Sequence, residues 1–284
     1  MRPSAVVRLV RAPAALTVPG DVLAGAAASG RPACPATLVT AASSVCLYWA
    51  GMALNDWADR DLDAGERPER PIPSGQISPR AALTVACGLT CAGLCLAAVA
   101  EGRRGLLTAL PLTGAIWAYD LMLKDTAWGP AGMAATRMLN VLRGAVRGGA
   151  LQALPAAAVV GAHTHAVTRL SRHEVGGGPR SAPAAALAAG GAIGAGTALA
   201  GRRSGLADAE LLALAYVCCC APAQLDAVRS PTAAAVRRAV GAGIHALLPL
   251  QGALIARSGS RRAALTVAAG YPLARLLARK AAVT

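Results

Sequence analysis

The chain has 284 residues, of which 55% are hydrophobic and only 15% are charged, and its formal net charge is +14. Soluble domains usually carry about 25% charged residues, so this composition argues against a soluble globular protein. Aromatic residues make up only 3% of the chain, and no basic patch alternates with them as in nucleic-acid-binding proteins. We therefore predict no nucleic-acid partner, and we expect the positive charge to lie in loops beside anionic membrane lipid.

The hydrophobic residues fall in long blocks rather than in short amphipathic stripes. Several blocks approach the ~20 residues that a helix needs to cross a bilayer. They predict a single all-α integral-membrane domain over residues 1–284, a multi-span transmembrane helical bundle of about nine spans, or ten if every marginal block crosses. The blocks cover residues 12–30, 36–57, 80–100, 104–122, 129–151, 153–168, 183–200, 206–224, 233–256 and 263–279.

Charged residues gather in the loops that follow the second, fourth, sixth and eighth blocks. The intervening loops are short and hold little beyond a pair of arginines. Alternate loops share one side of a membrane, so one face is predicted to carry the chemistry. By the positive-inside rule we expect that face to be cytoplasmic in a bacterial-type plasma membrane.

Six of the fourteen acidic residues lie within residues 55–75, at the end of the second block. On a helix Asp56, Asp59 and Asp63 share one face, and Asp61 lies on the other side. Three carboxylates on one face repel one another unless a cation joins them. Because Mg²⁺ needs few carboxylates when phosphate oxygens complete its shell, the spacing predicts a magnesium-bridged diphosphate. The alternative is a solvated acidic helix end that is paired with the neighbouring arginines.

Three prolines within six residues, Pro68, Pro71 and Pro73, prevent the helix from continuing. They predict an ordered loop from which Arg67 and Arg70 reach phosphate oxygens with bidentate geometry. Alternatively, the two arginines neutralise the adjacent acids or lipid headgroups.

The pattern Asn55-Asp56-x-x-Asp59-x-x-x-Asp63, followed by Arg67-x-x-Arg70-Pro71 and Ser74-Gly75, resembles the first aspartate-rich motif of the UbiA-type intramembrane prenyltransferases. The resemblance implies an all-helical bundle with a lateral opening to lipid and loops that cap a central cavity. It also implies Mg²⁺-dependent transfer of a prenyl group from a polyprenyl diphosphate to an acceptor, which the motifs do not identify. The metal ligands would be Asp56, Asp59 and Asp63, the first two being catalytic, and Asn55, Arg67 and Arg70 would bind substrate.

A further stretch, Tyr119-Asp120-Leu121-Met122-Leu123-Lys124, fits the resemblance by its position at the end of the fourth block. The family tends to place a tyrosine and a basic residue there, near the diphosphate. Lys124 would stabilise the leaving group, Asp120 would orient Lys124 or the acceptor, and Tyr119 would bind substrate. Taken alone, a lysine at a span end is more often a snorkelling residue at the membrane interface.

Arg137 and Asn140 lie about one turn apart within the fifth block. An arginine inside a membrane span normally faces a polar cavity, so both residues are predicted to line the substrate cavity. Hydrogen bonding between helices is an equal alternative.

The second aspartate-rich motif of the family, expected after the sixth block, is degenerate in residues 164–174. Only Glu174 is acidic there, and Ser171 and His173 stand where carboxylates are expected. Glu174 is predicted to supply one metal ligand, Arg172 to bind diphosphate, and His173 to accept a proton or donate to diphosphate. A degenerate second motif of this kind is similar to what an EboC-like subgroup of the family, with a different acceptor, would show. A zinc site built from the nearby histidines is the alternative, but no thiolate is in reach by sequence.

Two other classes of function fit the same residues. A prenyl diphosphate cyclase would need no acceptor. A non-catalytic membrane protein could keep a lipid-diphosphate pocket for carrying or scaffolding, and the weakened second motif is the best argument for it.

Overall fold

The computed structural model describes residues 3–31, 34–203 and 206–283, and within these ranges the chain is all-helical, without a strand. This confirms the predicted fold class. The elements are α1 (Pro3–Leu9), η1 (Ala12–Thr17), α2 (Val18–Ala28), α3 (Pro35–Ala58), α4 (Arg60–Glu66), α5 (Pro79–Ala118), η2 (Tyr119–Leu123), α6 (Gly129–Gly144), α7 (Ala150–Ser171), α8 (Ser181–Arg203), α9 (Ala207–Arg229), α10 (Ala233–Ala256) and α11 (Arg261–Val283).

The third and fourth predicted blocks form the two arms of α5. The helical path is broken between them at Gly102, whose φ of 57° and ψ of −138° suit only glycine. The second arm then folds back along the first, so that the indole Nε1 of Trp117 donates to the hydroxyl of Thr90 at 3.3 Å. The break falls where the sequence predicted one.

Five helical stretches of the described residues are long and apolar enough to cross a membrane. They are Pro35–Ala58, Pro79–Leu123, Ser181–Arg202, Ala207–Arg229 and Ala233–Ala256. The second of these contains both arms of α5. The chain is thus an integral membrane protein. The number of spans, about nine from the sequence, remains a prediction.

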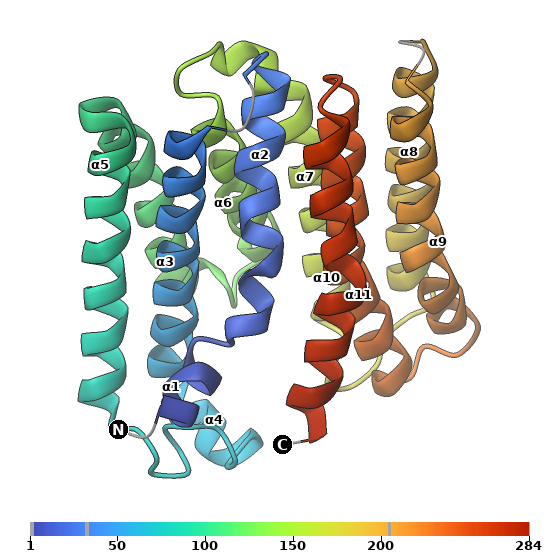
Figure 1. Ribbon diagram of the computed structural model, residues 1–284. Helices are drawn as coiled ribbons and strands as arrows, with labels where there is room; N and C mark the ends of the chain where they lie inside the picture. The colour runs from blue at the N-terminus through green and yellow to red at the C-terminus, as the bar shows by residue number, and fades with distance from the viewer. Residues whose placement is uncertain (1–2, 32–33, 204–205, 284) are drawn as a thin grey trace.

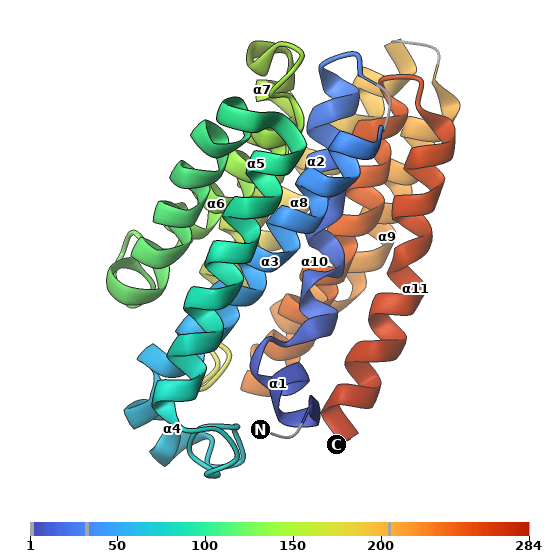
Figure 2. The same cartoon turned by 60° about the vertical axis from the view of Figure 1, so that its left-hand side comes forward.

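The long helices run side by side in one bundle, and both ends of the chain lie at the same end of it as α4 (Figures 1 and 2). The loops after α3, η2, α7 and α9 are joined by contacts: Lys124 pairs with Asp59, Arg172 donates to the Thr126 carbonyl, and the Gly178 N–H donates to the Pro231 carbonyl. We call the region that they form together with α4 the motif face. The sequence predicted that these charged loops would share a face, and the fold brings them together.

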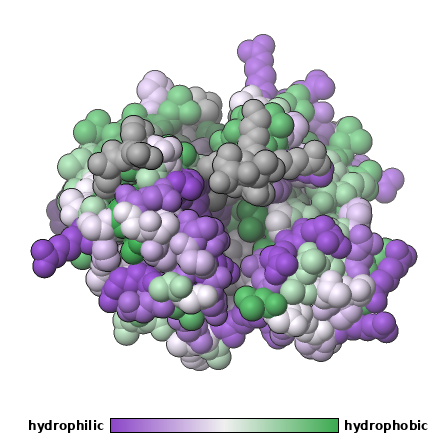
Figure 3. Space-filling view, turned by 90° about the horizontal axis from the view of Figure 1, so that it is seen from below, coloured by the Kyte–Doolittle hydropathy of each residue, from purple (hydrophilic) through white to green (hydrophobic). Residues whose placement is uncertain are grey.

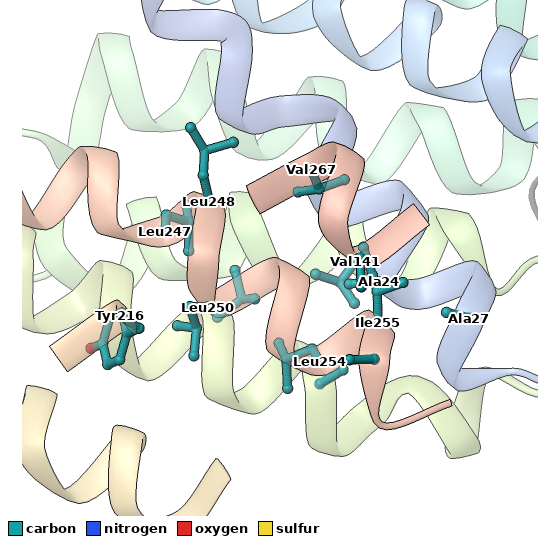
Figure 4. Packing of buried hydrophobic residues seen from close by; sticks show 14 of the residues in the cluster. Ala24, Ala27, Val141, Tyr216, Leu247, Leu248, Leu250, Leu254, Ile255 and Val267 are labelled. Atoms are coloured by element: carbon teal, nitrogen blue, oxygen red, sulfur yellow. The ribbon is translucent and has the colours of Figure 1, made fainter. Parts of the chain in front are cut away.

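The core is built around α10, which is buried along much of its length. Figure 4 shows its leucines and Ile255 packed against small and branched side chains of the neighbouring helices. Two glycines bring α2 and α6 into backbone contact: a Cβ on Gly25 would collide with the Val141 carbonyl, and one on Gly144 with the Val22 carbonyl. Small residues at such crossings are typical of membrane bundles.

Large apolar side chains also cover the outside of the bundle, Val99 on α5, Leu151 on α7 and Leu211 on α9 among them. Exposed apolar surface of this kind is what lipid tails contact. Cys87, Cys91 and Cys95 share one face of α5, as their spacing predicts, but all are exposed. They lie on the outer surface and do not pack inside the bundle.

Candidate active site

The acidic segment does not form the single helix that its spacing predicted, because it is broken at Asp59. α3 ends one residue earlier, and Asp59, with φ −89° and ψ 2°, joins it to the short helix α4. Asp56 and Asp63 are nevertheless both buried, whereas the Asp61 side chain is 87% exposed. Asp61 thus lies on the other side from the predicted metal ligands, as expected, even though the helix is broken.

Asp56, Asp59 and Asp63, the three predicted metal ligands of the first motif, are each paired with a basic side chain. Arg70, on the proline-rich loop, forms an ion pair with Asp63, and its Nη1 lies 3.5 Å from Oδ1 of Asp56. Lys124 forms an ion pair with Asp59. Segments that are far apart in the sequence thus bring acids and bases together at the motif face.

The fourth apolar block ends in a widened turn, the π-helix η2. The backbone N–H of Lys124 donates to the carbonyl of Tyr119, five residues earlier, at 2.9 Å. Such turns are frequent at functional sites because they change which way the following side chains point. Here Asp120 is buried and its Oδ1 accepts a hydrogen bond from Asn55 Nδ2 at 3.4 Å, while Lys124 reaches the acidic cluster.

Arg11 also belongs to this site, although no sequence pattern predicted it. Its Nη2 donates to Oδ1 of Asp56 at 2.6 Å and lies 3.5 Å from Oδ1 of Asn55. Its backbone has φ 44° and ψ 51°, a left-handed conformation that a non-glycine residue adopts at a cost. No local motif marks Arg11 in the sequence, since only the tertiary fold brings the start of η1 against the end of α3.

A cavity of about 390 Å³ extends from this site into the bundle. α7 lines it from Ser171 to His163, a rise of ~12 Å at 1.5 Å per residue. Seen from the motif face, hydrophilic residues lie on both sides of a hollow (Figure 3). Charged and polar residues of the motif face line one part of the cavity, Arg11, Asn55, Asp120 and Glu174 among them. The lining as a whole is mainly apolar, with Val18, Trp49, Met133, Ile244 and Leu247, but it also includes the buried polar residues Thr17, Thr136, Arg137 and His163.

Arg137 lines the cavity, as predicted, but its guanidinium group is held by Asp21 on α2. The pair is buried, with 3.0 Å from Nη2 to Oδ1 and 2.9 Å from Nε to Oδ2. Asn140 Nδ2 donates to Oδ2 of Asp21 at 3.0 Å, and Gln251 Nε2 donates to Oδ1 at 2.6 Å. Asn140 therefore bonds helix to helix and does not line the cavity. The presence of an acid inside the first apolar block was the signal that could have found Asp21.

From the degenerate second motif, Glu174 reaches the cavity. It lies within electrostatic range of Arg67 and Arg237. Partial burial raises the pKa of the Glu174 carboxyl, and the two arginines counteract that rise. Glu174 is thus the one predicted metal ligand on the far side of the cavity from the first motif.

The two other predicted residues of the second motif lie away from the cavity lining. Arg172 is exposed and donates a hydrogen bond to the backbone carbonyl of Thr126, which ties the loop after α7 to the loop after η2. His173 packs against Gly178 within its own loop. Neither side chain points at the acidic cluster in this arrangement.

No three His, Cys, Asp or Glu side chains within the described ranges are grouped closely enough to hold a metal ion by themselves. Mg²⁺ does not require such a group, because it usually binds one or two carboxylates and completes its shell with water and phosphate oxygens. Asp56 and Asp63 are close enough to share one guanidinium group, so a single cation can interact with both. The donor set therefore fits magnesium that arrives with a diphosphate.

Two solved structures share this fold. A UbiA homolog from Aeropyrum pernix K1 has a TM-score of 0.68 at 20% identity, covering 85% of this chain and 96% of that one. A structure of digeranylgeranylglyceryl phosphate synthase has a TM-score of 0.57 at 14% identity, covering 90% and 98%. At these identities the likeness defines a class of fold, the helical bundle of UbiA-type membrane proteins.

Residues 15–174 match the model of the UbiA prenyltransferase family, which is more than half of the chain. The chain belongs to the UbiA prenyltransferase family, as its first aspartate-rich motif predicted.

Named relatives match shorter stretches. Digeranylgeranylglyceryl phosphate synthase of Methanothrix thermoacetophila is 47% identical over 74 residues, which are 26% of this chain and 27% of that one. Chlorophyll synthase of Oryza sativa is 38% identical over 123 residues, which are 38% of this chain. The alignment spans 32% of the rice protein, so the chain matches about a third or less of each of these relatives.

Proposed function

We propose that this protein transfers a prenyl group from a polyprenyl diphosphate to an acceptor within the membrane. The observation that carries the proposal is the joining of a charged cluster, rich in both acids and bases, to a cavity that extends into the bundle and has a mainly apolar lining. The cluster suits a diphosphate and the cavity suits a hydrocarbon chain. Family membership and the names of the matching relatives, two kinds of synthase, support an enzymatic role.

The donor would bind with its diphosphate at the motif face. Asp56, Asp59 and Asp63 would hold Mg²⁺ there, with Glu174 as a ligand from the opposite side. The ion would neutralise charge on the diphosphate and so make it a better leaving group. Arg70 and Lys124 already lie at these carboxylates; on donor binding they would exchange carboxylate for phosphate oxygens.

The reaction would begin with cleavage of the bond between the allylic carbon and the diphosphate oxygen, and the electron pair would leave with the diphosphate. Lys124 and the arginines of the motif face, Arg11, Arg67 and Arg70, would take up the charge that develops on the leaving group. The apolar cavity would exclude water, which would otherwise capture the carbocation. An electron-rich atom of the acceptor would then form the new bond and lose a proton.

The acceptor would lie beside the donor within the same cavity. Asn55, Tyr119 and Asp120 line this cavity, and Asn55 donates a hydrogen bond to the Asp120 carboxylate; they would lie near the allylic end of the bound donor. Asp120 would orient the acceptor or Lys124. Arg172 and His173 would contact substrate only if the loop after α7 moved toward the cavity.

The test is release of diphosphate from labelled prenyl diphosphates by purified protein, with Mg²⁺ and total membrane lipid extract as the source of acceptor. We expect Asp56→Asn and Asp59→Asn to lower the rate at least ~100-fold, because charge stabilisation of the leaving group is lost. Asp61→Asn is the matched control: it removes a carboxylate of the same segment whose side chain points to solvent, and its rate should stay within about twofold of wild type. Removing Mg²⁺ with EDTA should abolish release.

Mass spectrometry of the products separates the competing functions. A prenylated lipid that appears only with protein, donor and extract supports transfer. A cyclic hydrocarbon formed without extract identifies a cyclase. Magnesium-dependent binding of donor with no turnover in any extract identifies a carrier. Equal diphosphate release by wild type and both asparagine variants would overturn the proposed site.

A further inference from the structure

A second buried arginine of α6, Arg143, lies near the end of the bundle opposite the motif face. Its side chain is 1% exposed. Nη1 donates to the hydroxyl of Ser44 at 2.6 Å and Nη2 donates to the hydroxyl of Ser43 at 2.8 Å, while Nε has no hydrogen-bond partner. None of the ion pairs formed by the described residues gives Arg143 a carboxylate partner.

This charge balance differs from that of Arg137, two turns earlier on the same helix. Arg137 is similarly buried, but Asp21 neutralises it. A guanidinium ion without a counter-charge is costly to bury, and hydroxyl groups supply hydrogen bonds but no charge. The carboxyl end of α6 adds only a fraction of a negative charge. Arg143 is therefore buried without a carboxylate counter-charge among the described residues.

A cavity of about 50 Å³ lies beside Arg143 and has the electrostatics for an anion. Arg31 and Arg147 line it and are exposed to solvent. Its one carboxylate, Glu101, is already paired with Arg147. Three arginines thus face one acid, and we call this site the Arg143 pocket.

The amino end of α3 adds to the positive potential of the Arg143 pocket. α3 is 24 residues long and begins at Pro35, which has no N–H, after Cys34, whose thiol lies 3.3 Å from the hydroxyl of Thr37. Cys34, Thr37 and Thr40, from the first turns of α3, line the pocket. Free backbone N–H groups at a helix start bind anions, above all phosphates.

We propose that the Arg143 pocket binds one phosphate-class oxyanion, either free phosphate or the headgroup phosphate of a membrane lipid. The small volume suits the head of one anion and not a whole substrate. The arginine geometry favours phosphate over a halide, because a guanidinium group donates two parallel hydrogen bonds to two oxygens. The site lies at the opposite end of the bundle from the proposed diphosphate site and does not depend on it.

The test measures the thermal stability of the purified full chain in detergent, with EDTA to keep metal-dependent diphosphate binding out of the signal. Sodium gluconate holds the ionic strength constant. Phosphate, chloride and phosphatidylglycerol are titrated separately, with phosphatidylcholine as the lipid control. Wild type should show a saturable rise of roughly 5 °C or more at a hundredfold excess over Kd, because a ligand that binds only the folded state stabilises it.

Three variants assign the effect to the pocket. Arg143→Gln should abolish the rise. Arg31→Gln removes the charge of an exposed arginine at the rim, together with its hydrogen bond to the Arg147 carbonyl, and should weaken the affinity about tenfold because a charge-assisted contact is lost. Arg262→Gln changes an exposed arginine elsewhere at the same end and should behave as wild type. If phosphate raises the thermal stability, the free anion is enough to fill the pocket. If only phosphatidylglycerol raises it, the bound phosphate is that of a lipid headgroup.

Three results would overturn the inference. They are no rise in wild type with either ligand, an equal rise in Arg143→Gln, and an equal rise with chloride. If Arg143→Gln does not fold, Arg31→Gln decides, and an unchanged affinity in that variant counts against the pocket.

Discussion

Asp21 and Arg137 form an ion pair inside the bundle, with side chains that are 0% and 7% exposed. We expect Asp21→Asn to destabilise the protein by about 3–5 kcal/mol, because it leaves the guanidinium group buried without a counter-charge. Thermal unfolding in detergent, or resistance to proteolysis, measures the loss.

Two further variants show whether the cost comes from the uncompensated charge. Asp208→Asn removes the acid of an exposed ion pair with Arg261 and should cost no more than ~1 kcal/mol. Adding Arg137→Met to Asp21→Asn should restore part of the stability, since the unpaired cation is removed. If the double variant is no more stable than Asp21→Asn, the charge is not the cause.

Residue types and spacing predicted which acids and bases of the candidate active site lie together. They identified the acids of the first motif, the basic loop after it, and Lys124, all of which meet at the motif face. They did not predict Arg11, because no short-range pattern distinguishes it from Arg2 and Arg8. Contacts such as the one between Arg11 and Asp56 depend on how helices pack, and the local sequence does not contain that information.

At the scale of elements, the crossing of α2 and α6 depends on two glycines whose backbones touch the opposite helix. We expect Gly25→Ala and Gly144→Ala each to destabilise the bundle by about 1–3 kcal/mol, because the new methyl group must push a backbone carbonyl away. Unfolding midpoints in detergent measure the effect.

Gly88→Ala is the matched control for the glycine variants. It lies in the interior of α5, is exposed, and has nothing within 4 Å of an added Cβ. Alanine should be neutral or should stabilise the helix there by up to ~1 kcal/mol. Equal destabilisation at positions 25, 88 and 144 would contradict close packing of α2 on α6.

Helix positions were predictable from apolar blocks, but helix irregularities were not. Every predicted block contains a helix, although the block 129–151 runs past the end of α6 at Gly144 into the turn before α7, and the break at Gly102 follows its glycine and arginine signals. The interruption at Asp59 and the π-helix after Ala118 carry no such signals. Both lie where two parts of the site meet, since Asp59 at the interruption pairs with Lys124 directly after the π-helix.

For the molecule as a whole, the arrangement of charged loops predicts its orientation in the membrane. In a variant with all eight cysteines replaced, we would introduce a single cysteine by Ser74→Cys, on the motif face, or by Arg104→Cys, at the opposite end. Both positions are exposed. In intact bacterial cells a membrane-impermeant maleimide should label position 104 and spare position 74, because the motif face is expected to be cytoplasmic.

Permeabilised cells provide the control for this experiment, since both positions should then react. Labelling of position 74 alone in intact cells would reverse the orientation. It would also place the proposed chemistry on the outer side of the membrane.

Arg70 gives the whole molecule a consequence for the order in which its substrates bind. Its guanidinium group joins the carboxylates of Asp56 and Asp63, and Arg11 makes a further contact with Asp56. A metal ion that came alone would compete with these fixed cations, and a diphosphate that came alone would meet two carboxylates. When both arrive as one complex, the carboxylates can release the arginines and bind the metal ion, and the released arginines can bind the phosphate oxygens. Entry of the donor is then an exchange of ionic partners, and the site should favour the preformed magnesium–diphosphate complex over either component offered separately.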